Sequence, residues 1–517
     1  MRKATTRSAA IILVFNSGML CIGACGAGGS TTVPDYSTAA ADPAATPPIG
    51  ASPTSGNASD GASTSPGASV AGTGNTAATS AASATLDGVG TSAGVSAVET
   101  ADPPAAGTTA TPPSSVATGT PGFENLAPPL GEPLPAEGKT LTPPPPAGWV
   151  YYEIDDSVCR DGSKAGFYLH RGTVGKLLIF LEGGGACMND HLCAFNQHNV
   201  NVAFAGDGQT LISAAIGTVP DRQQPGVFSQ IDHQGPPLGI HDLDNPLNPF
   251  MGWHQVYVPY CSGDVHAGTR ANGSVFGLQN QQFLGYPNMK AFISRLVPTF
   301  RTDVDHVVLS GSSAGSIGAL FNVSMVSDAF GPDIQVDVIA DSGLPLRDTY
   351  WPTCLQTRYR EIWGLDAALP PDCAGCFNPD GGGLLEGMGT FLKQKHPKLR
   401  GAAFSHTEDE VMRLFYSGGL NNCAAFDDLD PVAVVLGNLL DPSVIYPGPE
   451  YTKAIFDTRD WVKANSFPLS TYIVAGPNPN FHQTIFRQEF YEVMSGGITP
   501  AEFIKRWLEG QDQTIEP

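Results

Sequence analysis

Apolar residues in the second part of the chain occur in short continuous runs, separated by stretches of helical periodicity. We interpret six of these runs as strands: Leu177–Leu181, Val256–Val258, Val307–Leu309, Val336–Ala340, Gly401–Phe404 and Thr471–Ala475. A continuous apolar run of this length is typical of a strand that is covered on both faces. Helical patterns lie between several of them, at Gln279–Val297, Ser316–Phe330 and Glu410–Tyr416. Strands that alternate with helices predict an α/β fold, with a mostly parallel sheet flanked by helices.

Residues 26–147 have a different composition, mainly Ala, Gly, Ser, Thr and Pro with few large apolar side chains. Such a segment cannot bury enough apolar surface to offset the loss of chain entropy on folding. We interpret it as a disordered tether that holds a folded domain away from a membrane or wall. The composition changes near Trp149, so we expect one folded domain over residues 148–517.

The first 25 residues have the features of an export signal. Arg2, Lys3 and Arg7 give a basic start, and the apolar stretch that follows is too short to span a bilayer. Small residues precede Cys25, which resembles a bacterial lipoprotein box with Cys25 as the lipidated residue; ordinary signal cleavage is the alternative. We expect an exported protein, either secreted or held at the cell envelope by this lipid anchor alone.

The formal net charge of -22, from 49 acidic and 27 basic residues, restricts the class of partner. Nucleic-acid binding requires a basic surface, so we do not expect a nucleic acid as partner. An acidic surface otherwise indicates solubility and does not specify a fold.

Eight of the ten cysteines remain after the two in the signal are excluded. An even number in an exported protein suits disulfides, and the candidates are Cys159, Cys187, Cys193, Cys261, Cys354, Cys373, Cys376 and Cys423. Cys373 and Cys376 form a C-x-x-C motif that could also be a redox or zinc pair. A second pair with metal-ligand spacing is missing nearby in the sequence, so we favour disulfides and expect no metal.

The strongest local motif is G-x-S-x-G, formed by Gly311, Ser313 and Gly315 between an apolar run and a helical pattern. Ester hydrolysis needs a hydroxyl exposed on a sharp strand-to-helix turn, and glycines on both sides allow that turn. The motif predicts Ser313 as a nucleophile. The alternative is a glycine-rich helix start in which Ser313 is a cap.

A glycine run follows the strand that ends at Leu181. Acyl transfer creates an oxyanion that needs preorganised N–H donors, and such a loop supplies them together with the residue after the nucleophile. The predicted donors are Gly184, Gly185 and Ala314. Three glycines alone could also form a phosphate loop or a turn.

A serine nucleophile needs a general base, and in this fold the base follows the serine and the acid along the chain. His396, His406 and His482 are the histidines after Ser313. We expect His396, in a lysine-rich stretch, to face solvent, and His406 to be a neighbour of the acid loop. His482 follows the last strand by a short loop, so it is the preferred base.

The acid should follow the strand that ends at Phe404, where Glu408, Asp409 and Glu410 are available. These carboxylates could instead complement the dipole of the following helix, and spacing does not choose among them. Asp264 and Asp341 each end a predicted strand, where carboxylates commonly bond backbone N–H groups. We expect both to be structural.

Six ordered motifs together resemble the pectin acetylesterase/Notum family of α/β-hydrolases. They are the segments at Cys159–Ser163, Leu181–Cys187, Pro259–Asp264, Gly311–Gly315, Ala340–Gly343 and Phe481–Gln483. The resemblance implies an α/β-hydrolase-like fold, a triad of Ser313, Asp409 and His482, and a disulfide between Cys187 and Cys193. It implies no cofactor. Gly185 and Ala186 stand where relatives often carry a bulky aromatic residue, so the shape of the acyl pocket differs.

The function that we expect is therefore a serine carboxylic-ester hydrolase that deacetylates an acylated polysaccharide such as pectin. A deacylase for longer acyl or lipid–protein esters is the second hypothesis. A tethered binding module without activity is the third, and it has no physical need for a complete triad.

Overall fold

The computed structural model describes residues 122–141, 144–193, 196, 239–424, 426–427, 429, 445–475 and 482–517. The predicted signal, Cys25 and the tether up to residue 121 lie outside the described residues. All described residues belong to one compact unit. Within these residues, no helix combines the length and hydropathy that a membrane span requires.

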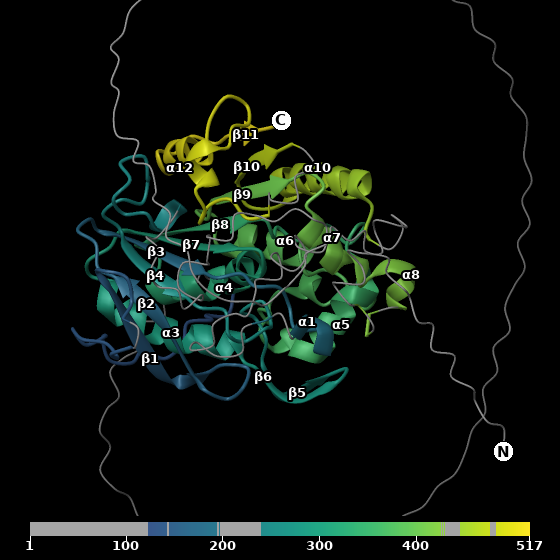
Figure 1. Cartoon of the computed structure of the whole chain (residues 1–517), viewed down its shortest axis with the longest axis horizontal. Helices are drawn as coiled ribbons and strands as arrows, with labels where there is room; N and C mark the ends of the chain where they lie inside the picture. The colour runs from purple at the N-terminus through teal and green to yellow at the C-terminus, as the bar shows by residue number, and fades with distance from the viewer. Residues whose placement is uncertain are drawn as a thin grey trace, which may run out of the picture. The chain divides into compact units, whose positions relative to one another are not determined.

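A nine-stranded sheet forms the centre of this unit, in the order β1-β2-β4-β3-β7-β8-β9-β10-β11 (Figure 1). Its strands are β1 Trp149–Val158, β2 Lys164–His170, β3 Lys176–Leu181, β4 His254–Val258, β7 His306–Ser312, β8 Gln335–Asp341, β9 Gly401–His406, β10 Leu469–Val474 and β11 Thr514–Ile515. The strand β2 is antiparallel to β1 and β4, and the other neighbouring pairs are parallel. The mostly parallel α/β-hydrolase-like sheet is confirmed, including all six predicted strands.

Helices cover both faces of the sheet. The longer ones are α3 Gly285–Phe300, α4 Ala314–Phe330, α5 Thr353–Trp363, α6 Glu386–Lys395, α7 Glu410–Ser417, α10 Gly448–Asn465 and α12 Pro500–Leu508. Shorter elements are α1 Asp190–Cys193, α8 Leu420–Cys423, α11 Glu489–Glu492 and 3-10 turns at Gly239–His241, Leu365–Ala367 and Ala374–Cys376.

Successive residues of β3 enter two separate hydrophobic clusters. Leu177 and Ile179 pack in the larger cluster with α3 and α4, whereas Leu178 and Phe180 pack in the cluster that includes α12. Side chains of a strand alternate between the two faces of its sheet, so both faces must be apolar when both are covered. This explains the continuous apolar runs in the sequence.

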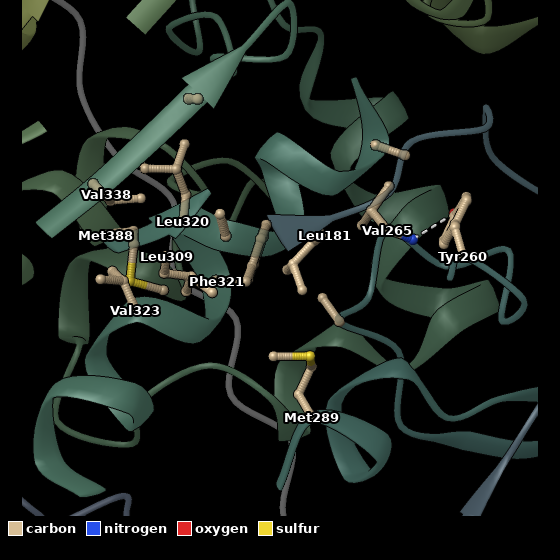
Figure 2. Packing of buried hydrophobic residues seen from close by; sticks show 14 of the residues in the cluster. Leu181, Tyr260, Val265, Met289, Leu309, Leu320, Phe321, Val323, Val338 and Met388 are labelled. Atoms are coloured by element: carbon tan, nitrogen blue, oxygen red, sulfur yellow. Dashed lines mark hydrogen bonds between the residues drawn. The ribbon is translucent and has the colours of Figure 1, made fainter. Parts of the chain in front are cut away.

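The larger cluster fixes the positions of β3, β7 and α4 relative to one another. Figure 2 shows Leu181 and Leu309 of the sheet close to Leu320 and Phe321 of α4. All four are buried, and β7 leads directly into α4. The junction between β7 and α4 is therefore held by core packing on both sides.

The predicted helix at Gln279–Val297 begins later than expected. Leu278–Phe283 is strand β6, which pairs with β5 (Arg270–Val275) in a separate hairpin. The helix starts at Gly285, and Pro287 lies in its first turn, where a missing N–H costs nothing. Pairing with β5 therefore overrides the helical pattern of this segment.

Part of the predicted tether is an ordered strap, residues 122–141, along the folded unit. The N–H of Leu126 donates to Asp328 at 2.7 Å, and the buried Lys395 ammonium donates both to Asp328 and to the carbonyl of Glu124, each at 2.7 Å. Leu134 is buried in the core. These contacts join residues 122–141 to the folded unit, whereas the folded domain was expected over residues 148–517.

All eight cysteines after the predicted signal form disulfides. The pairs are Cys159–Cys261, Cys187–Cys193, Cys354–Cys423 and Cys373–Cys376. Disulfides persist in oxidising compartments, so these four bonds fit an extracellular protein. They include the pair implied by the family resemblance, and Cys373 and Cys376 bond to each other.

Candidate active site

Ser313 occupies the sharp turn between β7 and α4. Its backbone has φ 54° and ψ -121°, a conformation that non-glycine residues rarely adopt. The N–H of Ser313 donates to the carbonyl of Asp341 at 2.7 Å, which holds the turn against β8. Ser313 stands at the N-cap position of α4, but its side chain makes no capping hydrogen bond to the helix.

The two glycines of the motif are required by close backbone approaches. A Cβ atom on Gly311 would lie 2.2 Å from the carbonyl oxygen of Gly315. A Cβ atom on Gly315 would lie 2.0 Å from the carbonyl oxygen of Leu181, at the end of β3. Any side chain at either position would displace the turn that carries Ser313.

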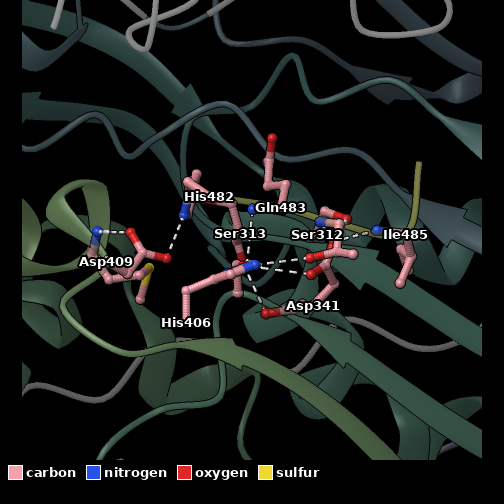
Figure 3. A network of polar contacts seen from close by, with 12 residues as sticks. Ser312, Ser313, Asp341, His406, Asp409, His482, Gln483 and Ile485 are labelled. Atoms are coloured by element: carbon pink, nitrogen blue, oxygen red, sulfur yellow. Dashed lines mark hydrogen bonds and ion pairs between the residues drawn. The ribbon is translucent and has the colours of Figure 1, made fainter. Parts of the chain in front are cut away.

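The structure brings Ser313, His482 and Asp409 together from distant parts of the sequence (Figure 3). His482 Nε2 lies 2.9 Å from Ser313 Oγ, and His482 Nδ1 lies 2.8 Å from Asp409 Oδ2. A carboxylate only accepts, so we assign the ring proton to Nδ1, and Nε2 then accepts from the serine hydroxyl. The three residues are between 3 and 4% exposed, so the row of groups is shielded from water.

Asp409 is held in place immediately before the first residue of a helix. It is the N-cap of α7, and its Oδ1 accepts the N–H of Met412 at 2.9 Å while Oδ2 contacts His482. The positive end of the helix dipole favours the ionised carboxylate. Of the three carboxylates that the sequence offers, Asp409 is thus the one in contact with His482.

Of the other two candidate histidines, His406 is buried and His396 is partly buried, and both are neutral. His396 was expected to face solvent, which is wrong: its Nε2 lies 2.9 Å from Ser324 Oγ, and burial lowers its pKa to about 4. His406 ends β9, where burial also lowers its pKa to about 4, and its Nε2 lies 3.0 Å from Thr484 Oγ1.

The glycine loop after β3 lies directly against the nucleophile. A Cβ atom on Gly183 would lie 2.9 Å from Ser313 Cβ. Gly184 and Gly185 have φ angles of 147° and 78°, and their N–H groups make no hydrogen bond to any described residue. The same holds for the N–H of Ala314, the first residue of α4. Three backbone N–H groups without a partner among the described residues therefore lie in the glycine loop and at the helix start next to the nucleophile.

Sequence reasoning missed the residues that support this loop. The Asn196 side-chain amide donates to the carbonyl of Gly184, and the Tyr260 ring packs against the Cα of Gly184. Glu182 accepts the N–H of Tyr260 at 2.8 Å. Tyr260 lies in the segment Pro259–Asp264, which carries no recognisable chemistry of its own, and its contacts are with a loop far away in the sequence.

An apolar pocket opens beside Ser313. Its lining is mainly aromatic and aliphatic: Gly185, Ala186, Val265, Ser313, Ala314, Ile317, Phe321, Trp351, Tyr359, Trp363, Leu365, Met412 and Phe415. Ligand sites are lined mainly by side chains of these kinds. This pocket therefore has the lining for an apolar group attached to the reacting atom.

Two buried aspartates, Asp341 at the end of β8 and Asp264 in the loop after β4, bond backbone N–H groups, as expected. Asp264 accepts the hydroxyl of Ser262 at 2.6 Å and the N–H of Gly285 at the start of α3 at 2.7 Å, and burial raises its pKa to about 6. Asp341 accepts the hydroxyl of Ser312 at 2.7 Å. Within the described part of the chain, no group of three or more His, Cys, Asp or Glu residues could hold a metal ion.

A sequence model of the family described as pectinacetylesterase matches residues 151–380. The chain is similar to this family over that segment. The matched segment includes Ser313 and the glycine loop but ends before Asp409 and His482. The assignment of those two residues therefore depends on the geometry described above.

Curated relatives are named palmitoleoyl-protein carboxylesterases. The chain is 29% identical to notum2 of Xenopus laevis over 191 residues, 36% of this chain and 34% of that protein. It is 30% identical to NOTUM of Homo sapiens over 193 residues, 36% and 34% of the two chains. It is 29% identical to NOTUM of Drosophila melanogaster over 230 residues, which are 42% of this chain and 31% of that protein. The match spans about a third of the length of these relatives.

Proposed function

We propose that this protein is a serine carboxylic-ester hydrolase with Ser313 as nucleophile. The observation that supports this most strongly is the bridging position of His482, within hydrogen-bond distance of both Ser313 and Asp409. A pure binding module has no need for this arrangement. The names of the family and of the relatives, an acetylesterase and carboxylesterases, agree with the proposal.

The first half of the reaction forms an acyl-enzyme. Ser313 Oγ attacks the ester carbonyl carbon while His482 Nε2 takes the hydroxyl proton, and Asp409 stabilises the resulting imidazolium. The carbonyl oxygen becomes an oxyanion that accepts hydrogen bonds from the N–H groups of Gly184, Gly185 and Ala314. The bond to the leaving oxygen then breaks, and His482 returns the proton to that oxygen, which releases the alcohol.

The second half releases the acid. A water molecule attacks the carbonyl carbon of the acyl-enzyme, and His482 Nε2 takes its proton. The same three N–H donors stabilise the second oxyanion. When the bond to Ser313 breaks, His482 protonates Ser313 Oγ, so the resting site is restored.

The apolar pocket favours an acyl group larger than acetyl. An acetyl group has one methyl, whereas the pocket offers five aromatic side chains, and burial stabilises by about 0.8 kcal/mol per methylene. We therefore propose a medium or longer acyl chain as substrate. Deacetylation of a glycan such as pectin is the second candidate, because the matching family is described as pectinacetylesterase.

Hydrolysis of p-nitrophenyl esters from acetate to palmitate by the full chain tests both candidates. We expect kcat/KM to rise with chain length and to fall at least about 10³-fold in Ser313→Ala at every length. Ile317→Phe adds volume in the pocket and should lower kcat/KM for long esters while that for acetate is retained. A preference for acetate would favour the glycan candidate, and turnover that survives Ser313→Ala would exclude the proposed nucleophile.

We also propose export with lipidation at Cys25. The four disulfides support export. The anchor itself depends on the sequence around Cys25 alone. Palmitate labelling of the expressed chain, lost in Cys25→Ser, tests it, and a labelled Cys25→Ser chain would contradict it.

A further inference from the structure

The carboxylate of Asp341 connects the two segments that carry the candidate nucleophile and base. It is fully buried at the end of β8. Its Oδ2 accepts the hydroxyl of Ser312 at 2.7 Å and the backbone N–H groups of Thr484 and Ile485 at 2.9 and 3.1 Å. One carboxylate oxygen thus bonds the residue before the nucleophile and the two residues that come shortly after the histidine of the triad.

A second row of hydrogen bonds starts at the other oxygen of Asp341 (Figure 3). Oδ1 lies 3.2 Å from Ser342 Oγ, which accepts the N–H of Gln483 at 2.9 Å. His406 lies between the two segments, with Nδ1 3.3 Å from Ser342 Oγ and Nε2 3.0 Å from Thr484 Oγ1. The residues after the triad histidine are therefore bonded to β8 and β9 at several points.

The chemistry of these groups determines which atom donates and which accepts in each of these hydrogen bonds. An ionised Asp341 only accepts, so the Ser342 hydroxyl donates to it. Ser342 has no second proton, so Nδ1–H of His406 donates to Ser342 Oγ. A neutral imidazole then accepts at Nε2, and Thr484 donates to it.

We propose that Asp341 is a positioning residue for His482, and that it acts through Ser312, the loop 483–485 and the row formed by Ser342 and His406. This inference deepens the proposed function and rests on it. Gln483 has a φ of 72°, so the loop adopts a strained conformation that outside contacts must hold. The side chain of Asp341 supplies such contacts, and its own backbone carbonyl oxygen accepts the N–H of Ser313.

The matched pair Asp341→Asn and Asp337→Asn tests the proposal in the full chain. Asp337 lies on the same strand, is also fully buried, and accepts hydrogen bonds from His306, Gln335 and Arg400 at the opposite end. Both variants keep the side-chain size and remove one charge. Asp341→Asn should lower kcat about 10²-fold with little change in KM, since a displacement of about 1 Å can cost that much. Asp337→Asn should lower the melting temperature but keep kcat.

Thr484→Val is a milder variant that removes one hydroxyl from the row. It should lower kcat less than Asp341→Asn does, and ¹⁵N chemical shifts should show His406 protonated at Nδ1 in the native chain. A proton on Nε2 instead would overturn the direction of the row.

The proton in the hydrogen bond between His482 and Asp409 gives a readout that does not require turnover. Its NMR resonance should shift or disappear in Asp341→Asn and remain unchanged in Asp337→Asn. If the native chain lacked Ser313-dependent turnover, the proposed function would fail, while this resonance would still test the positioning. An unchanged resonance and an unchanged kcat in folded Asp341→Asn would overturn the inference.

Discussion

Four non-glycine residues in or beside the triad have positive φ angles. Ser313, Ser342, Glu408 and Gln483 have φ angles of 54°, 53°, 62° and 72°. Non-glycine residues in such conformations cost of order 1–3 kcal/mol each and persist only where the surrounding structure holds them. The four positions lie at the ends of strands or beside a triad residue, so the fold holds the site in a geometry that the local sequence disfavours.

Gly315→Ala tests whether the nucleophile turn depends on a close backbone approach. The added Cβ would lie 2.0 Å from the carbonyl oxygen of Leu181, so β3 and α4 must separate. We expect a loss of kcat of about 10²-fold or more, measured with p-nitrophenyl esters. Gly418→Ala is the control, because its Cβ would be 3.4 Å from the nearest atom, an ordinary contact. Equal activity of the two variants would contradict this account of the turn.

The sequence allowed prediction of those site residues whose chemistry has a local signature. Ser313 has its glycines, and His482 has its place after the last strand. The choice of Asp409 among three neighbouring carboxylates needed the family resemblance, since spacing left it open. Asn196 and Tyr260 escaped prediction because each supports the glycine loop through a tertiary contact that no local pattern encodes.

The elements that were hardest to predict are those without an apolar pattern. The sheet strands are recognisable because both faces are buried. The β5–β6 hairpin is rich in amide side chains, and its strands pair with each other outside the main sheet. The strap, residues 122–141, has the composition of the tether, and several of its contacts are to residues more than 150 positions away. Composition alone therefore does not reveal these contacts.

Removal of the strap tests its role in stability. A chain that begins at residue 148 loses the buried Leu134. It also removes the N–H of Leu126 that donates to Asp328 and the carbonyl of Glu124 that accepts from Lys395. We expect its free energy of unfolding to be lower by at least about 2 kcal/mol, the value for burial of one leucine side chain. Urea unfolding of this chain and of one that begins at residue 122 measures the difference. Equal stabilities would show that the strap is not part of the folded unit.

For the whole molecule, the buried histidines predict a loss of stability in acid. Burial lowers the pKa of His241, His266, His396 and His406 to about 4. The unfolded chain takes up these protons near pH 6.5 and the folded chain does not, so stability falls as the pH decreases from 6.5 to 4. Asp264, with a pKa raised to about 6, has the opposite effect in the same range.

Urea unfolding between pH 7.5 and 4.5 measures this balance. Each pKa unit corresponds to about 1.4 kcal/mol. Burial also raises the pKa of Asp341 and of Glu410, so the four histidines act against three carboxylates, and we expect the histidines to outweigh them. The midpoint should therefore fall steadily with decreasing pH. A midpoint that stays constant or rises toward pH 4.5 would contradict the burial of these histidines as neutral groups.

The central claim concerns one atom, Ser313 Oγ, activated by His482 and Asp409. A fluorophosphonate probe reacts with an activated serine, and mass spectrometry of the labelled chain identifies the residue. We predict a single adduct on Ser313 that is absent in Ser313→Ala and forms much more slowly in His482→Ala. Labelling of another serine, or equal labelling in His482→Ala, would contradict the account.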